Sequence, residues 1–154
     1  MKIKFALSLV VLLLATFTAA QTTTFNSASD GFQVTSPTAT FTELRPGTYG
    51  GSDSQGDYSV TVTRYTRELM KDDFLRIVVV LSDGHTMVTS KDDLDFEGQP
   101  GVMRLWKTST GKECNWITFK GARVYQITFA SDREADGINF NTVNDFMNSF
   151  KFTN

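Results

Sequence analysis

Apolar and polar residues alternate along the middle of the chain in short segments that Gly-containing turns separate. Residues 57–65 alternate through Tyr58, Val60 and Val62, with β-branched Thr residues between them. A period of two predicts a β-strand with one buried face. The same pattern predicts strands over 32–35, 41–45, 94–97, 102–108, 113–120 and 123–130, with turns at 98–101, 110–111 and 121–122. We expect 41–45 to pair with 32–35.

Two stretches lack the composition of a strand. Residues 22–30 are small and polar, and they predict an irregular lead-in. Residues 49–57 contain three Gly, two Ser and two Asp, and they predict a loop.

Two other segments show the helical period of 3.6 residues. Between 68 and 82, six apolar residues recur at spacings that place them on one helix face: Leu69, Met70, Phe74, Ile77, Val78 and Leu81. Residues 77–81 alone would also suit a buried strand. Near the C-terminus, Phe140, Val143, Phe146, Met147 and Phe150 are three or four residues apart. Asn139 or Asn141 could cap the start of this second helix.

The predicted turns fix which residues share a face of the sheet. With hairpin tips at 110–111 and 121–122, one face is apolar and the other is mixed, and a shift by one residue would scramble both. The apolar face holds Met103, Leu105, Cys114, Trp116, Tyr125, Ile127 and Phe129. The mixed face holds Val102, Arg104, Trp106, Asn115, Ile117, Phe119, Val124, Gln126 and Thr128. Strands with segregated helices predict an α+β fold, an antiparallel β-sheet flanked by helices.

The N-terminus has the organisation of a secretory signal peptide. Lys2 and Lys4 precede an apolar run over 5–14, and small residues precede a cleavage point after Ala20. We therefore expect a signal peptide over 1–20 and a single domain over 21–154, exported to the periplasm or secreted. An uncleaved membrane anchor is the alternative, but the apolar run is short for a membrane span.

Composition excludes several classes of protein. Removing Lys2 and Lys4 leaves 13 cationic against 17 acidic residues, a net charge of −4, which excludes the strongly basic signature of nucleic-acid binding. One Cys cannot build a disulfide-stapled scaffold or a Cys-rich zinc module. Because Cys114 falls on the apolar face, we expect an inert buried thiol and a monomeric chain.

Several short motifs resemble one family. These are 30–34 (DGFQV) with Pro37, 98–101 (GQPG), 121–127 (GARVYQI) and 145–150 (DFMNSF). Together they are similar to the Mog1/PsbP-like superfamily, in particular to its small exported bacterial members. The resemblance spans most of the mature chain and implies an α/β/α sandwich, usually without catalysis. The motifs are turns and core positions, so the resemblance carries over no catalytic residue.

Candidate chemistry is sparse. His85 is the only His, and its possible nucleophile, Cys114, is expected on the core face; no Gly-x-Ser-x-Gly elbow occurs. Asp132, Glu134 and Asp136 precede Gly137 at the spacing of a calcium-loop start, but position twelve would be Val143 rather than Glu. A polar loop before a helix is the alternative. We expect the acidic residues Asp92, Asp93, Asp95 and Glu97 to protect a sheet edge. No cofactor is predicted.

Trp106 is the strongest binding candidate. It lies on the mixed face near Arg104 and Lys107, either as an exposed interface anchor or covered by a helix. Tyr49 and Tyr58 flank the Gly-rich segment and could edge a pocket. The sequence therefore predicts an exported, non-catalytic accessory domain that binds a protein partner or a small ligand through the mixed face around Trp106. A carrier that holds a small apolar ligand between sheet and helix is a further possibility of the same non-catalytic kind. The alternative is a metal-dependent or hydrolytic enzyme that uses the 132–136 loop or His85.

Overall fold

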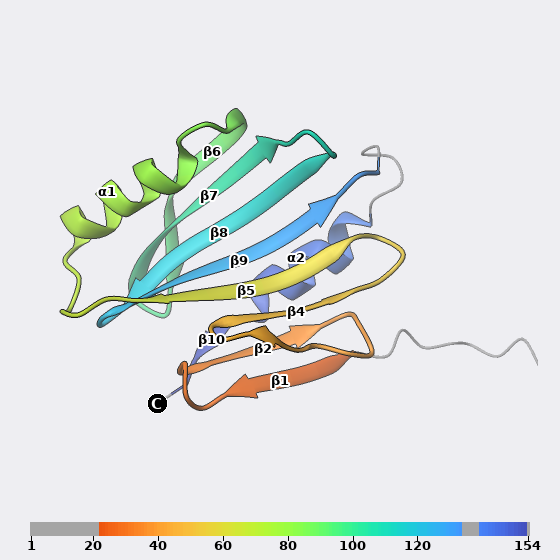
Figure 1. The fold of residues 1–154 in the computed structure, drawn as a ribbon, viewed down its shortest axis with the longest axis horizontal. Helices are drawn as coiled ribbons and strands as arrows, with labels where there is room; N and C mark the ends of the chain where they lie inside the picture. The colour runs from red at the N-terminus through yellow and green to blue at the C-terminus, as the bar shows by residue number, and fades with distance from the viewer. Residues whose placement is uncertain (1–21, 134–138, 154) are drawn as a thin grey trace, which may run out of the picture.

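The computed structural model describes residues 22–133 and 139–153, which form ten strands and two helices (Figure 1). In chain order these are β1 (Thr23–Ser27), β2 (Phe32–Ser36), β3 (Thr42–Arg45), β4 (Thr48–Ser52), β5 (Asp57–Arg64), α1 (Lys71–Ser82), β6 (Thr86–Phe96), β7 (Gln99–Lys107), β8 (Lys112–Lys120), β9 (Arg123–Ser131), α2 (Phe140–Asn148) and β10 (Lys151–Phe152). No helix within the described residues is long and apolar enough to cross a membrane.

A seven-stranded antiparallel sheet forms the body of the molecule, in the order β3-β4-β5-β9-β8-β7-β6. The predicted register is confirmed. Met103 lies opposite Trp116, and Trp116 lies opposite Ile127. Leu105, Cys114 and Phe129 form the next row on the same face. The opposite face has the expected composition as well, because Arg104, Asn115 and Thr128 are aligned across the same three strands.

One face of this sheet packs against α2 and a small second sheet, ordered β1-β2-β10 (Figure 1). Aromatic rings fill the space between these layers. Phe32 of β2 packs on Phe150, and Tyr58 of β5 packs edge-on against Phe146 of α2. A small apolar ligand held here would have to displace these rings. Asn139 caps α2, as one of the two expected alternatives, by accepting hydrogen bonds from the amides of Asn141 and Thr142.

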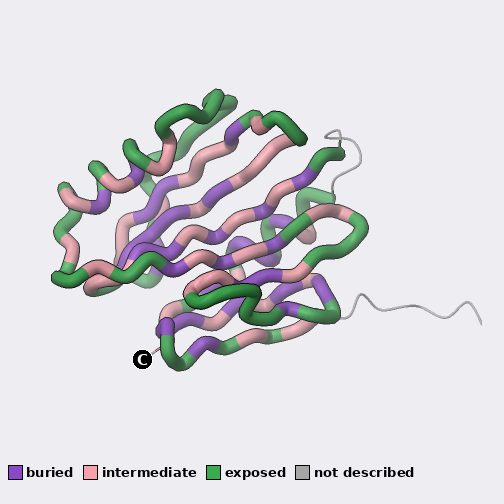
Figure 2. The backbone as a smooth tube through the Cα atoms, in the orientation of Figure 1, coloured by how far each residue is buried: buried purple, intermediate pink, exposed green. Residues whose placement is uncertain are grey.

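The other face is covered in part by α1, which packs on strands β7 to β9. Phe74 and Val78 of α1 contact an apolar cluster that includes Val102, Ile117, Phe119 and Val124. The segment 77–81 is helical rather than a strand, and the helix begins at Lys71 instead of residue 68. The outer side of α1 and most of β6 are exposed, whereas buried positions alternate along the central strands (Figure 2). The structure therefore has the predicted α+β, helix-flanked architecture.

Four local expectations were wrong. Residues 48–52 form strand β4 rather than a loop, and residues 23–27 form strand β1 rather than a lead-in. Strand β3 pairs with β4, not with β2, whose partners are β1 and β10. The turn before β7 is centred on Glu97 and Gly98, both with positive φ, so Gln99, Pro100 and Gly101 already belong to the strand.

Candidate functional site

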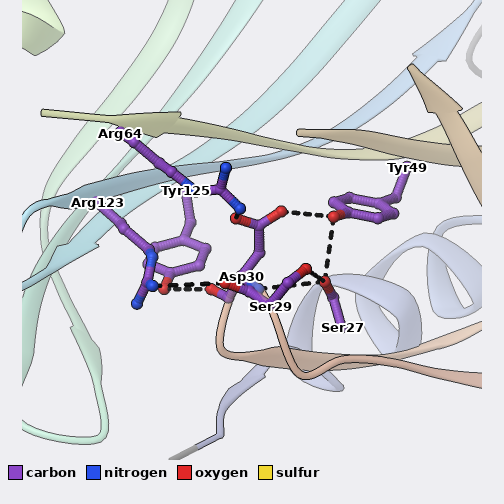
Figure 3. Close-up of polar contacts among 7 residues, drawn as sticks. All are labelled: Ser27, Ser29, Asp30, Tyr49, Arg64, Arg123 and Tyr125. Atoms are coloured by element: carbon purple, nitrogen blue, oxygen red, sulfur yellow. Dashed lines mark hydrogen bonds and ion pairs between the residues drawn. The ribbon is translucent and has the colours of Figure 1, made fainter. Parts of the chain in front are cut away.

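A buried carboxylate joins the two sheets at one end of the molecule. Asp30 lies in the tight turn between β1 and β2 and is buried. The turn needs Gly31, whose φ is +69°, and it is closed by the Gly31 amide, which donates to the Ser27 carbonyl at 2.8 Å. The sharp turn places the Asp30 side chain between the small sheet and strands β4, β5 and β9 (Figure 3).

Hydrogen bonds to hydroxyl groups hold Asp30 in place. The Tyr49 hydroxyl, from β4, donates to Oδ2 of Asp30 at 2.5 Å. Ser27 supports both groups, because its hydroxyl donates to Tyr49 at 3.1 Å and accepts from the Asp30 amide at 3.3 Å. The Tyr125 hydroxyl, from β9, donates to the Asp30 carbonyl at 2.8 Å. A buried carboxylate requires such partners.

The charge of Asp30 is compensated by Arg64 at the end of β5. Nη2 of Arg64 lies 2.5 Å from Oδ1 of Asp30, yet Oδ1 accepts no well-aligned hydrogen bond. The contact is therefore mainly one of charge. The Arg64 side chain remains 56% exposed, whereas that of Asp30 is 1% exposed. Arg64 thus neutralises a buried acid and still presents much of its guanidinium to solvent.

Two further cations lie beside Arg64. Arg123 of β9 is its register partner in the sheet, and Lys120 of β8 is in turn the register partner of Arg123. The three side chains form a row across three neighbouring strands, on the face that packs against the small sheet. We call Arg64, Lys120 and Arg123 the basic row. It lines a cleft of about 510 Å³ whose wall also includes Glu68, Tyr125 and Thr153.

Burial controls the protonation of the site's tyrosines. The pKa of Tyr49 is raised by burial first and by its hydrogen bond to Asp30 second. Burial also raises the pKa of Tyr125. Both tyrosines therefore stay neutral near pH 7 and act as hydrogen-bond donors, not as bases.

The predicted binding residues are dispersed in the structure. Tyr49 and Tyr58 do not edge an open pocket, because they are 3% and 1% exposed. Trp106 is 2% exposed, so the exposed-anchor alternative is wrong, and the contact that covers the indole comes from a turn rather than from a helix. His85, in the turn after α1, stacks on the indole with ring centroids 4.3 Å apart. Trp106 is thus a packing residue and has no open surface for an interface.

The neighbours of Trp106 have different environments. Arg104 is largely covered, with its side chain 12% exposed, and it pairs with Asp92 of the edge strand β6 at 2.5 Å. Lys107 is exposed and lines a shallow depression together with His85. The acidic run from Asp92 onward lies on or just after β6, the outermost strand, where the sequence places it.

A Cys–His nucleophilic pair does not form. Cys114 packs against the cluster between the two sheets, whereas His85 stacks on Trp106, which points to the opposite face. Burial, followed by the nearby Glu113, raises the pKa of Cys114 to about 11. The seven-stranded sheet therefore separates a protonated thiol from the imidazole.

The calcium-loop expectation falls mostly outside the described residues. Glu134 and Asp136 lie there, as does Gly137. Asp132 is described, and it lines a polar cleft of about 630 Å³ with Asp53 and Glu113. No group of three or more metal-binding side chains occurs within residues 22–133 and 139–153.

Sequence reasoning did not find the site around Asp30. Its residues come from a turn and from the ends of three strands. A hydrophobic period identifies the interior of an element, and it gives no information on the side chains at the element's ends. One signal was present. The alternation through Tyr58, Val60 and Val62 continues to Arg64, which puts a cation at the end of a buried face.

The fold is PsbP-like. The solution structure of cyanobacterial PsbP (CyanoP) from Synechocystis superposes with a TM-score of 0.61 at 12% identity, over 86% of this chain and 93% of that one. A crystal structure from Bacteroides thetaiotaomicron superposes with a TM-score of 0.57 at 12% identity, over 85% of this chain. This chain spans 48% of the Bacteroides protein. No protein-family model matches the sequence, and no curated protein sequence matches it either.

Proposed function

We propose that the chain is an exported, non-catalytic binding domain that engages a protein partner or a small ligand through the cleft of the basic row. The observation that carries this proposal is the alignment of Arg64, Lys120 and Arg123 on neighbouring strands beside an open cleft. Like charges directly opposite one another destabilise a sheet. A stable fold does not need this arrangement, so a role in binding explains it better.

The charge count supports the same interpretation. Asp30 pairs with Arg64, and within the described residues neither Lys120 nor Arg123 forms an ion pair. The PsbP-like fold and the separation of His85 from Cys114 favour binding over catalysis. The signal-peptide pattern at residues 1–20 supports export.

Native mass spectrometry of the chain, isolated gently from its own host, tests the proposal. We expect a mass that begins at Gln21, together with a bound small molecule or a partner protein that crosslinks near Lys120. The double variant Lys120→Gln/Arg123→Gln should lose this species, whereas Lys107→Gln, a change at an exposed Lys elsewhere, should keep it. A chain that carries no ligand and forms no crosslink would refute the proposed function.

A further inference from the structure

We infer that the cleft of the basic row binds a small-molecule oxyanion, a phosphate or carboxylate group, between Arg64, Lys120 and Arg123. The inference rests on the proposed function, which makes this cleft the binding site, and it adds the chemical class of the ligand. Three observations carry it: the unused donors of the cations, an unpaired hydroxyl in the cleft wall, and the size of the cleft.

The cations of the row retain donors for a ligand. Arg123 donates one long hydrogen bond, from Nη2 to the Ser29 carbonyl at 3.4 Å, and its guanidinium also lies beside the Tyr125 hydroxyl, where it acts to lower the pKa that burial raises. Nζ of Lys120 lies 5.1 Å from the centre of the Phe152 ring, a contact that leaves its three N–H groups free of any carboxylate within the described chain. Guanidinium groups match the planar geometry of carboxylate and phosphate and bind them through paired hydrogen bonds.

A neutral side chain in the cleft wall also carries a hydroxyl group. Thr153 lines it, and its Oγ1 atom is buried without a hydrogen-bond partner in the described part of the chain. Its backbone amide is already used, because it donates to the Gly31 carbonyl at 2.9 Å. An unsatisfied buried hydroxyl costs stability. A bound oxyanion would supply the missing acceptor.

The dimensions of the cleft suit a small molecule. Its volume of about 510 Å³ lies within the range that small-ligand sites occupy. Glu68, on the segment before α1, is the acid in its wall, and its side chain forms no ion pair with the basic row. Glu68 would oppose an anion weakly, since it lies at an exposed position.

Calorimetric titration of the purified exported chain with inorganic phosphate and, separately, with citrate tests the inference. We expect saturable binding that weakens as NaCl rises from 20 mM to 500 mM, because salt screens the charges of the row (the Debye length is about 4 Å at the higher concentration). Binding of phosphate alone, of citrate alone or of both supports the inference and tells which oxyanion is preferred. Binding of neither overturns it.

Variants locate the site. Lys120→Gln and Arg123→Gln should each weaken binding by about tenfold, as expected for the loss of a charge-assisted hydrogen bond. Thr153→Val should weaken binding by about threefold to tenfold without lowering the melting temperature, since the hydroxyl has no hydrogen-bond partner among the residues that the structure describes. Glu68→Gln should tighten binding by about twofold, because it removes a negative charge from the cleft wall.

Lys107→Gln is the matched control and should leave the affinity unchanged. Equal affinities for all five variants would place the anion elsewhere and overturn the inference.

The two proposals can fail separately. If neither oxyanion binds, but a protein still crosslinks near Lys120 and is lost in the Lys120→Gln/Arg123→Gln variant, the oxyanion inference fails and the binding function stands. If the chain isolated from its host carries nothing and the titrations are also flat, both fail.

Discussion

The Tyr49 hydroxyl, on β4 of the large sheet, donates a 2.5 Å hydrogen bond to the Asp30 carboxylate, in the turn of the small sheet. Apolar packing alone would leave the angle between the two layers loosely defined. This bond, together with the bond from Tyr125 to the Asp30 carbonyl, fixes the β1–β2 turn against strands β4 and β9. It thereby holds Asp30 beside Arg64, and Arg64 in turn lines the cleft of the basic row.

Tyr49→Phe should lower the free energy of unfolding by about 1.5–3 kcal/mol, the usual value for a hydrogen bond to a charged group. The change removes only the hydroxyl and leaves Oδ2 of the buried Asp30 without its donor. Urea denaturation monitored by circular dichroism measures the loss.

Tyr58→Phe is the matched control. The Tyr58 hydroxyl is also buried, but within the described residues it makes no well-aligned hydrogen bond; burial first, and then the charge and proximity of Asp53, raise its pKa. Its removal should be neutral or slightly stabilising. Equal losses for the two variants would show that the bond to Asp30 contributes nothing specific.

Trp106→Ala should destabilise the fold by about 3–5 kcal/mol, because it removes a large buried side chain and leaves a cavity. Trp106→Phe should cost much less, since the indole N–H has no hydrogen-bond partner to lose among residues 22–133 and 139–153. Thermal melting of the two variants beside Lys107→Ala, an exposed change, gives the comparison. A Trp106→Ala protein as stable as the wild type would mean that the indole is an exposed anchor after all.

The register of strands β7, β8 and β9 could be predicted from the sequence because a single physical constraint determines it. The apolar set that includes Leu105, Trp116 and Ile127 reaches the core only when the turns fall at 110–111 and 121–122. Helices α1 and α2 were predictable for the same reason, since each has one apolar face that the sheet covers.

Strand β4 was not predictable by that logic, because its glycines serve packing rather than a turn. A Cβ on Gly51 would lie 2.1 Å from the Thr40 carbonyl oxygen, so only Gly allows the backbone to approach there. Composition alone cannot distinguish this use of Gly from a loop. Strand β1 was not predicted because Phe25 is its one apolar residue, and a lone apolar residue gives no period of two.

The candidate site around Asp30 could not be predicted from the sequence, for a different reason. Asp30, Arg64 and Arg123 are far apart in the sequence. Arg64 and Arg123 meet through the pairing of β5 with β9, and Asp30 reaches Arg64 from the turn of the small sheet. A single sequence gives no means of predicting that arrangement. Trp106 shows the converse case: its place on the mixed face was right, but its cover depends on the loop that brings His85 onto it.

Cys114 in the folded chain should react with iodoacetamide at pH 8 roughly 100-fold more slowly than in the chain unfolded in urea. Burial raises its pKa to about 11, whereas an unfolded thiol ionises near about 8.5. The raised pKa stabilises the fold fully below the unfolded value, and that contribution is lost as the pH rises toward 11. Mass spectrometry of timed samples measures the rates, and similar rates in both states would contradict the burial of the thiol.

Asp73→Asn should lower the melting temperature at pH 7, because Asp73 orders the start of α1. Its carboxylate accepts two hydrogen bonds from Arg67, both 2.8 Å long, and one from the Met70 amide at 3.1 Å. These bonds, those of Arg67 foremost, lower the pKa of Asp73 to about 2.

The depressed pKa determines the pH dependence of this effect. The stabilisation is present above the usual carboxyl pKa of 3.8 and is lost as the pH falls toward about 2. The difference in melting temperature between wild type and Asp73→Asn should therefore shrink over that range. It should also shrink in 0.5 M NaCl, since the ion pair with Arg67 is exposed.

Asp72→Asn removes the neighbouring acid of the same helix turn and should change the melting temperature less, because the bonds from Arg67 and Met70 to Asp73 remain. Equal effects of the two substitutions would show that a general attraction to the helix N-terminus, not the Arg67 contact, stabilises α1.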